Sequence, residues 1–244
     1  MNNYLLKIQY DGTNYAGWQI QENAITIQQK IVDAVNVILK EKVNLIGSGR
    51  TDSGVHAFGQ VANFKTELEL DIYKFQFQLN SVLPNDISIL EMKKVDESFH
   101  ARFDAKSRTY IYLFSHKKSP FYKNYSYQFS QIVNYDFNYL NNISKVLIGK
   151  KDFTSFSKKN TEVDDKNCNI SEICWSKRKL ISIFYITADR FLHGMVRTII
   201  GTLLYAGEKK FDEKDFIEIF EKKNREEAEQ SVPAKGLFLF KVRY

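Results

Sequence analysis

The spacing of apolar residues near the N-terminus changes from a period of two to a helical period, which limits the fold to classes that combine strands with helices. Residues 4–10 alternate between two faces, which predicts a half-buried strand that ends at the Asp11-Gly12 turn. Thr26, with Gln29 three residues later, has the pattern of a capping box at the start of a helix. The apolar stripe of that helix comprises Ile27, Ile31, Ala34, Val35, Ile38 and Leu39.

Helices and strands are predicted to alternate further along the chain. Asp71 can cap a second helix, which ends before Pro84 and is followed by a strand at residues 87–95. Residues 107–115 predict a strand with two apolar faces, which is typical of a central position in a sheet. One of these faces carries Tyr110, Tyr112 and Phe114.

The C-terminal half shows a comparable succession. Asp136 is predicted to begin a helix that Gly149 ends, residues 150–168 read as a mobile loop, and residues 170–188 predict a hairpin. A helix is expected from about residue 190, and strand alternation returns over the last residues of the chain, from Leu237 to Tyr244. This order of elements favours an α+β fold with two halves, residues 1–105 and residues 106–244.

The helix expected from residue 190 is apolar almost all round, apart from one polar stripe. This stripe carries Arg190, His193 and Arg197, together with the small residues Gly194 and Gly201. An unpaired buried cation is too costly, so Arg197 must find a carboxylate or face a wet cleft. The candidate partners are Asp52, Asp189 and Asp215.

Residues 47–64, GSGRTDSGVHAFGQVANF, place one carboxylate and one guanidinium in a glycine-rich turn between apolar segments. Arg50 projects from the same side of an extended segment as Asp52, and a nearby guanidinium favours the ionised carboxylate. Such a group can act as a nucleophile or a base. The alternative is an ordinary Asp-Ser-Gly turn. The density of polar residues favours a site, since the stretch also holds Thr51, His56, Gln60 and Asn63.

The charge of the chain favours a polyanionic partner. Lys and Arg number 35 against 29 for Asp and Glu, which gives a net charge of +6. Residues 101–125 interleave basic residues with tyrosines and contain Asp104 as their single acid, a pattern that suits RNA phosphates and unstacked bases. A surface-exposed strand pair would give the same pattern. The basic residues are Arg102, Lys106, Arg108, Lys117, Lys118 and Lys123.

Several classes of protein are disfavoured by the sequence. The two cysteines, Cys168 and Cys174, have no histidine at metal-ligand spacing, so we expect free thiols and no metal. No dinucleotide or phosphate-binding motif occurs, and no cofactor is expected. The most apolar long segment, residues 191–206, is shorter than the roughly 18 apolar residues of a membrane span. With no secretory signal at the N-terminus, we expect a soluble cytoplasmic protein.

The stretch GRTDSGVHAFGQVANF resembles the signature of the tRNA pseudouridine synthase A (TruA) family, in which the Asp of the GRTD run is catalytic. Similar blocks follow in order over the whole chain. They are YDGTNYAGWQIQ at 10–21, LNSVLP at 79–84, FHARFDAKSRTYIY at 99–112, RFLHGMVRTIIG at 190–201 and AKGLFLFKVRY at 234–244.

The resemblance implies two ferredoxin-like (RRM-like) halves whose antiparallel sheets join across a central catalytic cleft, within a homodimer. It implies isomerisation of uridine in the anticodon stem-loop of tRNA, at tRNA positions 38 to 40, without a cofactor. Asp52 would be the catalytic carboxylate and Arg50 would fill the space that the displaced base leaves. Tyr110 would pack against the uracil, Arg197 would orient Asp52, and Leu237 would wall the pocket.

One position departs from the family pattern, because Gly194 stands where many relatives carry a second His, which puts RNA placement near this helix start in question. Other functions stay open. The chain could be a paralogue that modifies another uridine of tRNA or ribosomal RNA, or a non-catalytic RNA-binding module. A metal-dependent nuclease that uses Asp11, Glu22 and Asp52 is disfavoured, since the acids are too sparse for a two-metal site.

Overall fold

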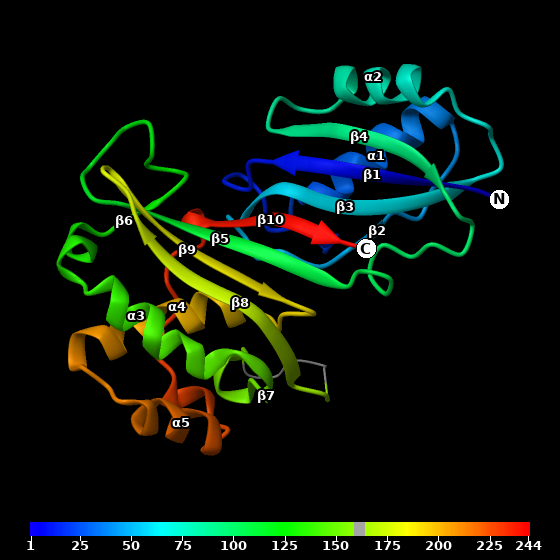
Figure 1. Ribbon diagram of the computed structural model, residues 1–244. Helices are drawn as coiled ribbons and strands as arrows, with labels where there is room; N and C mark the ends of the chain where they lie inside the picture. The colour runs from blue at the N-terminus through cyan, green and yellow to red at the C-terminus, as the bar shows by residue number, and fades with distance from the viewer. Residues whose placement is uncertain (159–163) are drawn as a thin grey trace. The chain divides into compact units, whose positions relative to one another are not determined.

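The computed structural model describes residues 1–158 and 164–244, and its fold is α+β with five α-helices among these residues (Figure 1). The chain divides into two compact units. The first comprises residues 1–106 and 238–244, and the second comprises residues 107–237. Within each unit most of the paired strands are antiparallel.

The first unit is built on a sheet in which the C-terminal strand is the parallel member. β10 runs parallel to β3, with Phe238 opposite His56, and the two-residue strand β2 (Ile46–Gly47) also pairs with β3. The strands lie in the order β4 (Ile87–Val95), β1 (Asn2–Tyr10), β3 (His56–Thr66) and β10 (Leu237–Arg243).

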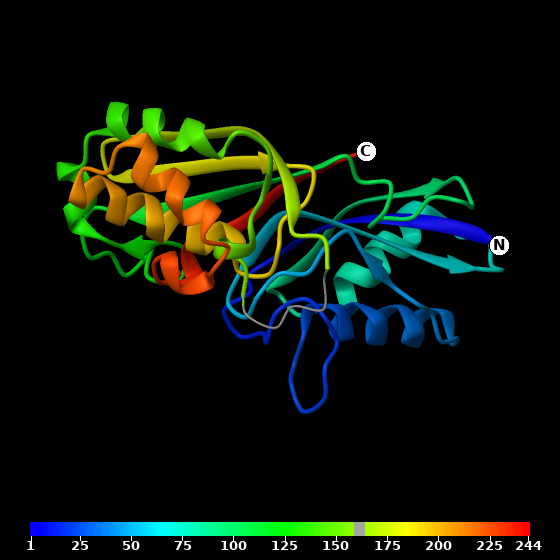
Figure 2. The same cartoon turned by 90° about the horizontal axis from the view of Figure 1, so that it is seen from below.

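Two helices lie on one side of this sheet, α1 (Ile27–Leu39) and α2 (Ile72–Val82) (Figure 2). Both predicted caps are confirmed, because Thr26 accepts from the Gln29 N–H and Asp71 accepts from the Lys74 N–H. The capping box predicted at Thr26 is only half formed, since the Gln29 side chain donates to Asp33 at 2.7 Å. The predicted strand at 87–95 is confirmed at both ends. The core between helices and sheet consists of Tyr4, Leu6, Ile8, Ile27, Ile31, Val35, Phe64, Phe75 and Leu79.

The second unit contains a four-stranded antiparallel path. A short strand, β6 (Tyr127–Gln128), pairs in parallel with the end of β5. The hairpin predicted over residues 170–188 is confirmed, with the Arg178 N–H donating to the Ile181 carbonyl at 2.9 Å in its turn. The strands lie in the order β5 (Ser107–Ser115), β9 (Ile181–Ala188), β8 (Asn167–Lys177) and β7 (Gly149–Asp152).

Three helices belong to the second unit: α3 (Phe137–Ser144), α4 (Met195–Lys209) and α5 (Glu213–Glu221). Asp136 caps α3, as predicted, and α3 packs against β8 and α4. Trp175 lies in the centre of the aromatic core, with ring centroids 4.8 Å from Phe184 and 5.9 Å from Phe114. Short 3₁₀ turns are η1 (Ser130–Asn134), η2 (Lys145–Leu147), η3 (Thr154–Phe156), η4 (Arg225–Glu227) and η5 (Ala234–Gly236).

The prediction that α4 begins near residue 190 is wrong by about one turn. The helix begins at Met195, because Gly194 adopts a left-handed conformation with φ of 73° and separates it from the preceding turn. Arg190 and His193 therefore lie outside the helix that was expected to carry them. A Cβ atom at position 194 would meet nothing within 4 Å, but a histidine there would have a strained backbone.

The loop predicted over residues 150–168 is also partly wrong. Residues 149–152 form β7, and residues from Asn167 onward belong to β8, with Lys151 opposite Cys168. Polar side chains on an edge strand give no hydrophobic alternation, so the pairing was not visible in the sequence. The prediction of mobility concerns in part residues 159–163, which lie outside the described residues.

In each unit, an asparagine on a helix covers backbone groups of a strand where no neighbouring strand pairs with them. These positions are on β4, the outer strand of the first unit, and on the part of β8 beyond its pairing with β7. Asn80 of α2 accepts from the Ile89 N–H at 2.8 Å and donates to the Ile89 carbonyl at 2.9 Å. Asn141 of α3 makes the same pair of bonds with Trp175 of β8, at 2.7 and 3.1 Å. Each side-chain amide thus takes the place that a peptide group of a neighbouring strand would occupy.

Candidate active site

Asp52 lies half-buried at the start of a tight turn, between β2 and β3 of the first unit. The Val55 N–H donates to the Asp52 carbonyl at 3.1 Å, and Gly54 has φ of 74° at the third position of this turn. A positive φ at that position is what a type II turn requires and what glycine supplies. We call residues 51–55 the Asp52 turn.

The segment between β1 and α1 holds the Asp52 turn in place through backbone contacts. Gly17, with φ of 95°, approaches so closely that a Cβ atom there would lie 2.4 Å from the Thr51 carbonyl oxygen. The Trp18 N–H donates to that same oxygen at 3.1 Å. The hydroxyl groups of Tyr10 and Thr51 are 2.8 Å apart, in a buried hydrogen bond that contributes about 1 kcal/mol.

Tyr15 holds the other half of the turn. Its carbonyl accepts from the Gly54 N–H at 3.3 Å and from the Ser53 hydroxyl at 3.2 Å. Its own hydroxyl donates to Asp86 at 2.5 Å, and burial together with this carboxylate raises the pKa of the Tyr15 phenol well above its usual range. Tyr15 is therefore a neutral donor at physiological pH, which ties the turn to the start of β4.

Some of the polar residues near Asp52 in the sequence support the structure, whereas Arg50 faces solvent. Gln60 and Asn63 are buried in β3 and stabilise neighbouring segments: Gln60 bonds to Ser48 at 2.6 Å and to the Gly49 carbonyl at 3.0 Å. Asn63 accepts from the Ala101 N–H at 2.9 Å. Arg50, which follows the run that Gln60 fixes, is exposed. Part of the polar density that suggested a site is thus structural support for it.

Tyr110 lies on β5 of the second unit, on the buried face that it shares with Tyr112 and Phe114, as predicted. It is 8% exposed, whereas Tyr112 and Phe114 are fully buried. The ring of Phe191 packs edge-to-face against Tyr110, with centroids 5.2 Å apart and planes at 89°. Such a pair contributes about 0.5–1.5 kcal/mol beyond area burial and fixes the orientation of the tyrosine ring.

Arg197 lies in the first turn of α4 and is half-buried. Its Nε donates to the Val232 carbonyl at 2.7 Å, and the Val232 N–H donates back to the Arg197 carbonyl at 3.2 Å. These two bonds direct the guanidinium stem along the segment that leads to β10. Burial raises the pKa of the nearby Tyr112 hydroxyl, and the positive charge of Arg197 offsets only part of this effect.

The two rival carboxylates for Arg197 have other backbone partners. Asp189 accepts from the N–H groups of Asn169 and Arg190, at 2.8 and 2.6 Å. Asp215 accepts from the Asp212 N–H in the capping box of α5. Both carboxylates thus have structural roles of their own.

Leu237 is buried where the second unit ends and β10 begins. It follows Gly236, at which a Cβ atom would lie 2.6 Å from the Tyr112 ring. Leu237, Tyr110 and Arg197 belong to the second unit, whereas Arg50 and Asp52 belong to the first. The pairing of Asp52 with Arg197 stays a prediction.

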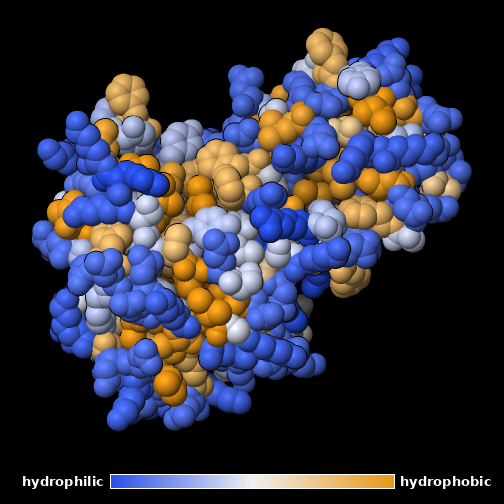
Figure 3. Space-filling model, viewed as in Figure 1, coloured by the Kyte–Doolittle hydropathy of each residue, from blue (hydrophilic) through white to orange (hydrophobic). Residues whose placement is uncertain are grey.

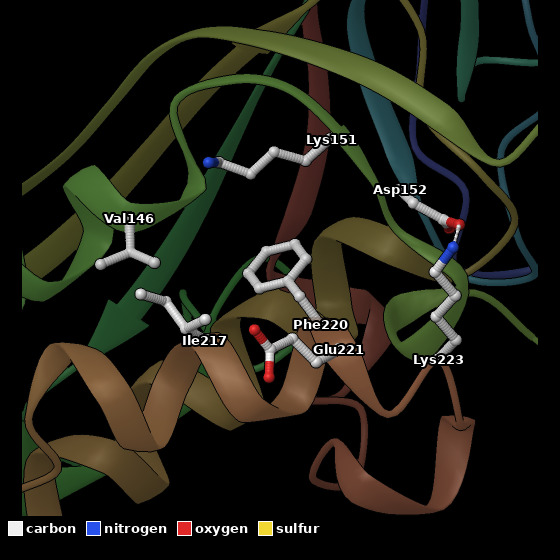
Figure 4. Close-up of a pocket in the computed structure, with 7 residues that line it drawn as sticks. All are labelled: Val146, Lys151, Asp152, Ile217, Phe220, Glu221 and Lys223. Atoms are coloured by element: carbon white, nitrogen blue, oxygen red, sulfur yellow. Dashed lines mark ion pairs between the residues drawn. The ribbon is translucent and has the colours of Figure 1, made fainter.

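A pocket of about 340 Å³ lies elsewhere in the second unit, between β7 and α5 (Figure 4). Its floor is apolar, formed by Val146, Ile217 and Phe220, and an ion pair of 3.0 Å between Asp152 and Lys223 lies at its rim. Lys151 and Glu221 complete the lining. None of the residues predicted for the active site lines this pocket, so it gives no support to the chemistry discussed above.

Among residues 1–158 and 164–244, no group of three or more His, Cys, Asp or Glu side chains is arranged to hold a metal ion. Within the same ranges, no helix combines the length and apolar character that crossing a membrane requires.

Comparison with known sequences places the chain in a class of RNA-modifying enzymes. The sequence model of the tRNA pseudouridine synthase family matches residues 7–104 and 143–244. This match covers well over half of the sequence, and the chain belongs to this family.

Individual relatives agree with the family over their full length. A tRNA pseudouridine synthase A of Caldicellulosiruptor saccharolyticus is 45% identical over 100% of both chains. One of Bacteroides fragilis is 43% identical over 99% of this chain and 96% of its own, and one of Azobacteroides pseudotrichonymphae is 41% identical over 100% and 97%. A chain in the crystal structure of a Cbf5-Nop10-Gar1 complex covers 83% of this chain and 54% of its own at 13% identity. Its TM-score of 0.34 is too low to support an argument.

Sequence reasoning gave no role to Tyr15 or Gly17, although both contact the Asp52 turn directly. The block that contains them, YDGTNYAGWQIQ, was recognised only as part of the resemblance. Its two glycines, close after a strand, were the signal that the backbone there approaches another segment.

Proposed function

We propose that this protein isomerises uridine to pseudouridine in the anticodon stem-loop of tRNA, at tRNA positions 38 to 40. The observation that carries the proposal is the Asp52 turn, in which a family-matching carboxylate is held by backbone contacts from Tyr15, Gly17 and Trp18. Preorganised placement of one reacting group is what a reaction without a cofactor needs most from its enzyme.

The reaction breaks the bond between C1′ of the ribose and N1 of uracil, turns the base, and joins C1′ to C5. Asp52 serves either as a nucleophile that adds to the sugar or base, or as a base that moves a proton at the sugar. Both routes return the carboxylate unchanged, and the proton lost from C5 balances the one gained at N1. No external group enters the product.

The other residues are proposed to act around that carboxylate. Arg50, which is exposed beside Asp52, enters the space that the flipped uridine leaves in its stem. Tyr110 packs against the uracil, with its ring orientation fixed by Phe191. Arg197 pairs with Asp52 and orients it, and Leu237 forms an apolar wall.

The active form is proposed to be a homodimer of chains, each with two ferredoxin-like halves. Sedimentation at micromolar concentration tests the dimer, and a stable monomer there contradicts it.

The proposed reaction uses no metal ion, so chelators should leave the turnover rate unchanged.

Mapping pseudouridine in total RNA from cells with and without the gene tests the proposed substrate. We expect loss of the modification at tRNA positions 38 to 40 alone. Loss at a different tRNA or ribosomal RNA uridine identifies a paralogue with another target. No loss at any site, together with intact RNA binding by the purified protein, identifies a non-catalytic RNA-binding module.

A further inference from the structure

One end of the second unit's sheet gathers cations without acids. Residues 117–125, which follow β5, and residues 177–180, the turn between β8 and β9, lie side by side, since the His116 N–H donates to the Leu180 carbonyl at 3.2 Å (Figure 1). We call these two segments the basic end. No Asp or Glu occurs within residues 116–135 or 173–181. The cations are Lys117, Lys118, Lys123, Lys177, Arg178 and Lys179.

Most of these cations face solvent. Lys177 is exposed as well, but its Nζ donates to the Val133 carbonyl at 2.7 Å and lies over the ring of Phe137. The other five are exposed, and none of them forms an ion pair with a carboxylate of residues 1–158 or 164–244. Five exposed like charges at one end of a sheet repel one another, and an anionic partner relieves that repulsion.

Aromatic rings stand among these cations. Phe121 is 83% exposed, and Tyr122 and Tyr125 are 43% and 41% exposed. The Tyr122 carbonyl accepts from the Tyr125 N–H at 3.1 Å and from the Ser126 hydroxyl at 2.9 Å, so the rings are presented by a hydrogen-bonded turn. In Figure 3, hydrophilic and hydrophobic residues are interspersed over this part of the second unit.

The base of the turn is fixed to the sheet. β6 pairs with the end of β5, and the Phe129 N–H donates to the Ser115 carbonyl at 3.1 Å. Tyr127 stacks on Phe129 with centroids 5.4 Å apart and an angle of 8° between the planes. Because both ends of this turn are fixed to the sheet, the turn loses less conformational entropy when a partner binds.

We propose that the basic end is a second RNA contact of this protein, separate from the residues assigned to chemistry, and that it takes unpaired nucleotides. The cations would neutralise phosphates, and Phe121 would stack on an exposed base. A fully paired duplex hides its base faces, so it gives this ring nothing to bind. A lipid surface fits less well, because the segment is a turn without the long apolar face of a membrane-surface helix. The proposal rests on the proposed function only in taking RNA as the partner.

The test compares three variants by their affinity for RNA. The first replaces Lys117, Lys118 and Lys123 with Gln, and the second is Phe121→Ala. The control replaces the exposed residues Lys30, Lys42 and Lys74 of the first unit with Gln and removes the same total charge. The probes are a tRNA transcript, an RNA stem-loop with a large unpaired loop, and a blunt RNA duplex of equal length. Circular dichroism and melting curves verify that each variant is folded.

We expect the lysine variant to bind tRNA at least tenfold more weakly at physiological salt. The slope of log affinity against log salt should fall by about 2, since each phosphate contact to a single strand contributes about 0.7. Phe121→Ala should lose roughly tenfold affinity for the unpaired loop and less than twofold for the duplex, because stacking needs an open base face. Single-turnover rates at saturating RNA should stay within twofold of wild type for both variants.

Equal losses in the control and lysine variants would overturn the proposal, and so would a Phe121→Ala variant that binds all three RNAs like wild type. Binding to vesicles of phosphatidylserine and phosphatidylcholine that the lysine substitutions abolish, with RNA affinity intact, would assign the surface to lipid instead. Wild-type protein that uses the basic end for RNA but isomerises no uridine would leave this inference standing and remove the proposed function.

Discussion

The Asp52 turn and the basic end, which are both proposed to contact RNA, are held in place by different means. Backbone groups hold the Asp52 turn on several sides, with Gly17 so close that a Cβ would lie 2.4 Å from the Thr51 carbonyl. The basic end is joined to the sheet through β6 and the Phe129 N–H, and most of its lysine and arginine side chains are exposed. A reacting carboxylate needs placement within fractions of an ångström, whereas contact with variable nucleotides needs reach and charge. If both proposals hold, backbone rigidity serves the chemical step and side-chain freedom serves the binding of RNA.

The largest expected effect comes from Asp52→Asn, which keeps the shape of the turn and removes the reactive oxygen. We expect isomerisation to fall by about a thousandfold or more, with melting temperature and RNA affinity near wild type. Tritium release from C5-labelled uridine in tRNA measures the rate. Activity within tenfold of wild type would remove Asp52 from the catalytic role.

Gly17→Ala tests whether the rigidity of the Asp52 turn depends on close backbone approach. The substitution strains a residue with φ of 95° and places a methyl group against the Thr51 carbonyl. We expect a loss of about 1–3 kcal/mol in the free energy of unfolding, with a lower rate at saturating RNA. Urea denaturation and single-turnover assays measure both.

Gly49→Ala is the matched control, because nothing lies within 4 Å of the Cβ position there. Its stability should change by less than about 0.5 kcal/mol. If the two alanine variants unfold at the same urea concentration, the contacts of Gly17 do not hold the turn.

Substitutions at Tyr110 and Phe121 compare a ring proposed to act at the reacting uridine with a ring proposed to act only in RNA binding. Tyr110→Leu keeps apolar bulk but removes the stacking face, and should slow turnover by about tenfold or more with little change in melting temperature. Tyr110→Phe keeps the ring and should retain most of the rate. Phe121→Ala, by contrast, should change affinity and leave the rate alone.

Two other results for Tyr110 are informative. If Phe fails as badly as Leu, the hydroxyl takes part in proton movement. If Leu loses activity only in step with stability, Tyr110 is a core residue and its proposed contact with uracil is wrong.

The smallest effect concerns the rim of the pocket in the second unit. Burial tends to raise the pKa of Asp152, but the Thr154 hydroxyl and the Lys223 ammonium outweigh it, so the pKa lies below its ordinary value. The stabilisation is present above the unfolded-state pKa of about 3.9 and is lost as the pH falls below it.

Asp152→Asn should therefore lower the melting temperature by about 1–3 °C at neutral pH and by less near pH 2, because the contact is partly exposed. The exposed pair of Lys94 and Glu69 is the control, and Glu69→Gln should change little at either pH. A constant deficit for Asp152→Asn across this pH range would show that the ion pair is not its cause.

Local chemistry made much of the fold predictable. Thr26, Asp71 and Asp136 were each identified as helix caps and act as such, and the strands at 87–95 and 107–115 have the predicted bounds. These signals depend on neighbours within one turn or on a period of two, so one segment of sequence contains them.

What the sequence did not reveal depends on the backbone conformation of single residues and on distant contacts. The left-handed backbone of Gly194 delays α4, and β7 exists because Lys151 faces Cys168, not because its own residues favour a strand. In the candidate site, Asp52 and Arg50 were visible as a motif, but the approach of Gly17 joins segments far apart in the chain. Hydrophobic periodicity does not encode a contact of that kind.

The asparagines on α2 and α3 have a consequence for behaviour at high protein concentration. An outer strand with free peptide groups is a template onto which another molecule can add a strand, and repeated addition leads to fibrils. Asn80 and Asn141 occupy those groups at Ile89 and Trp175 with an amide that cannot propagate the ladder. Each unit is thus closed to strand addition at that point by a helix of its own.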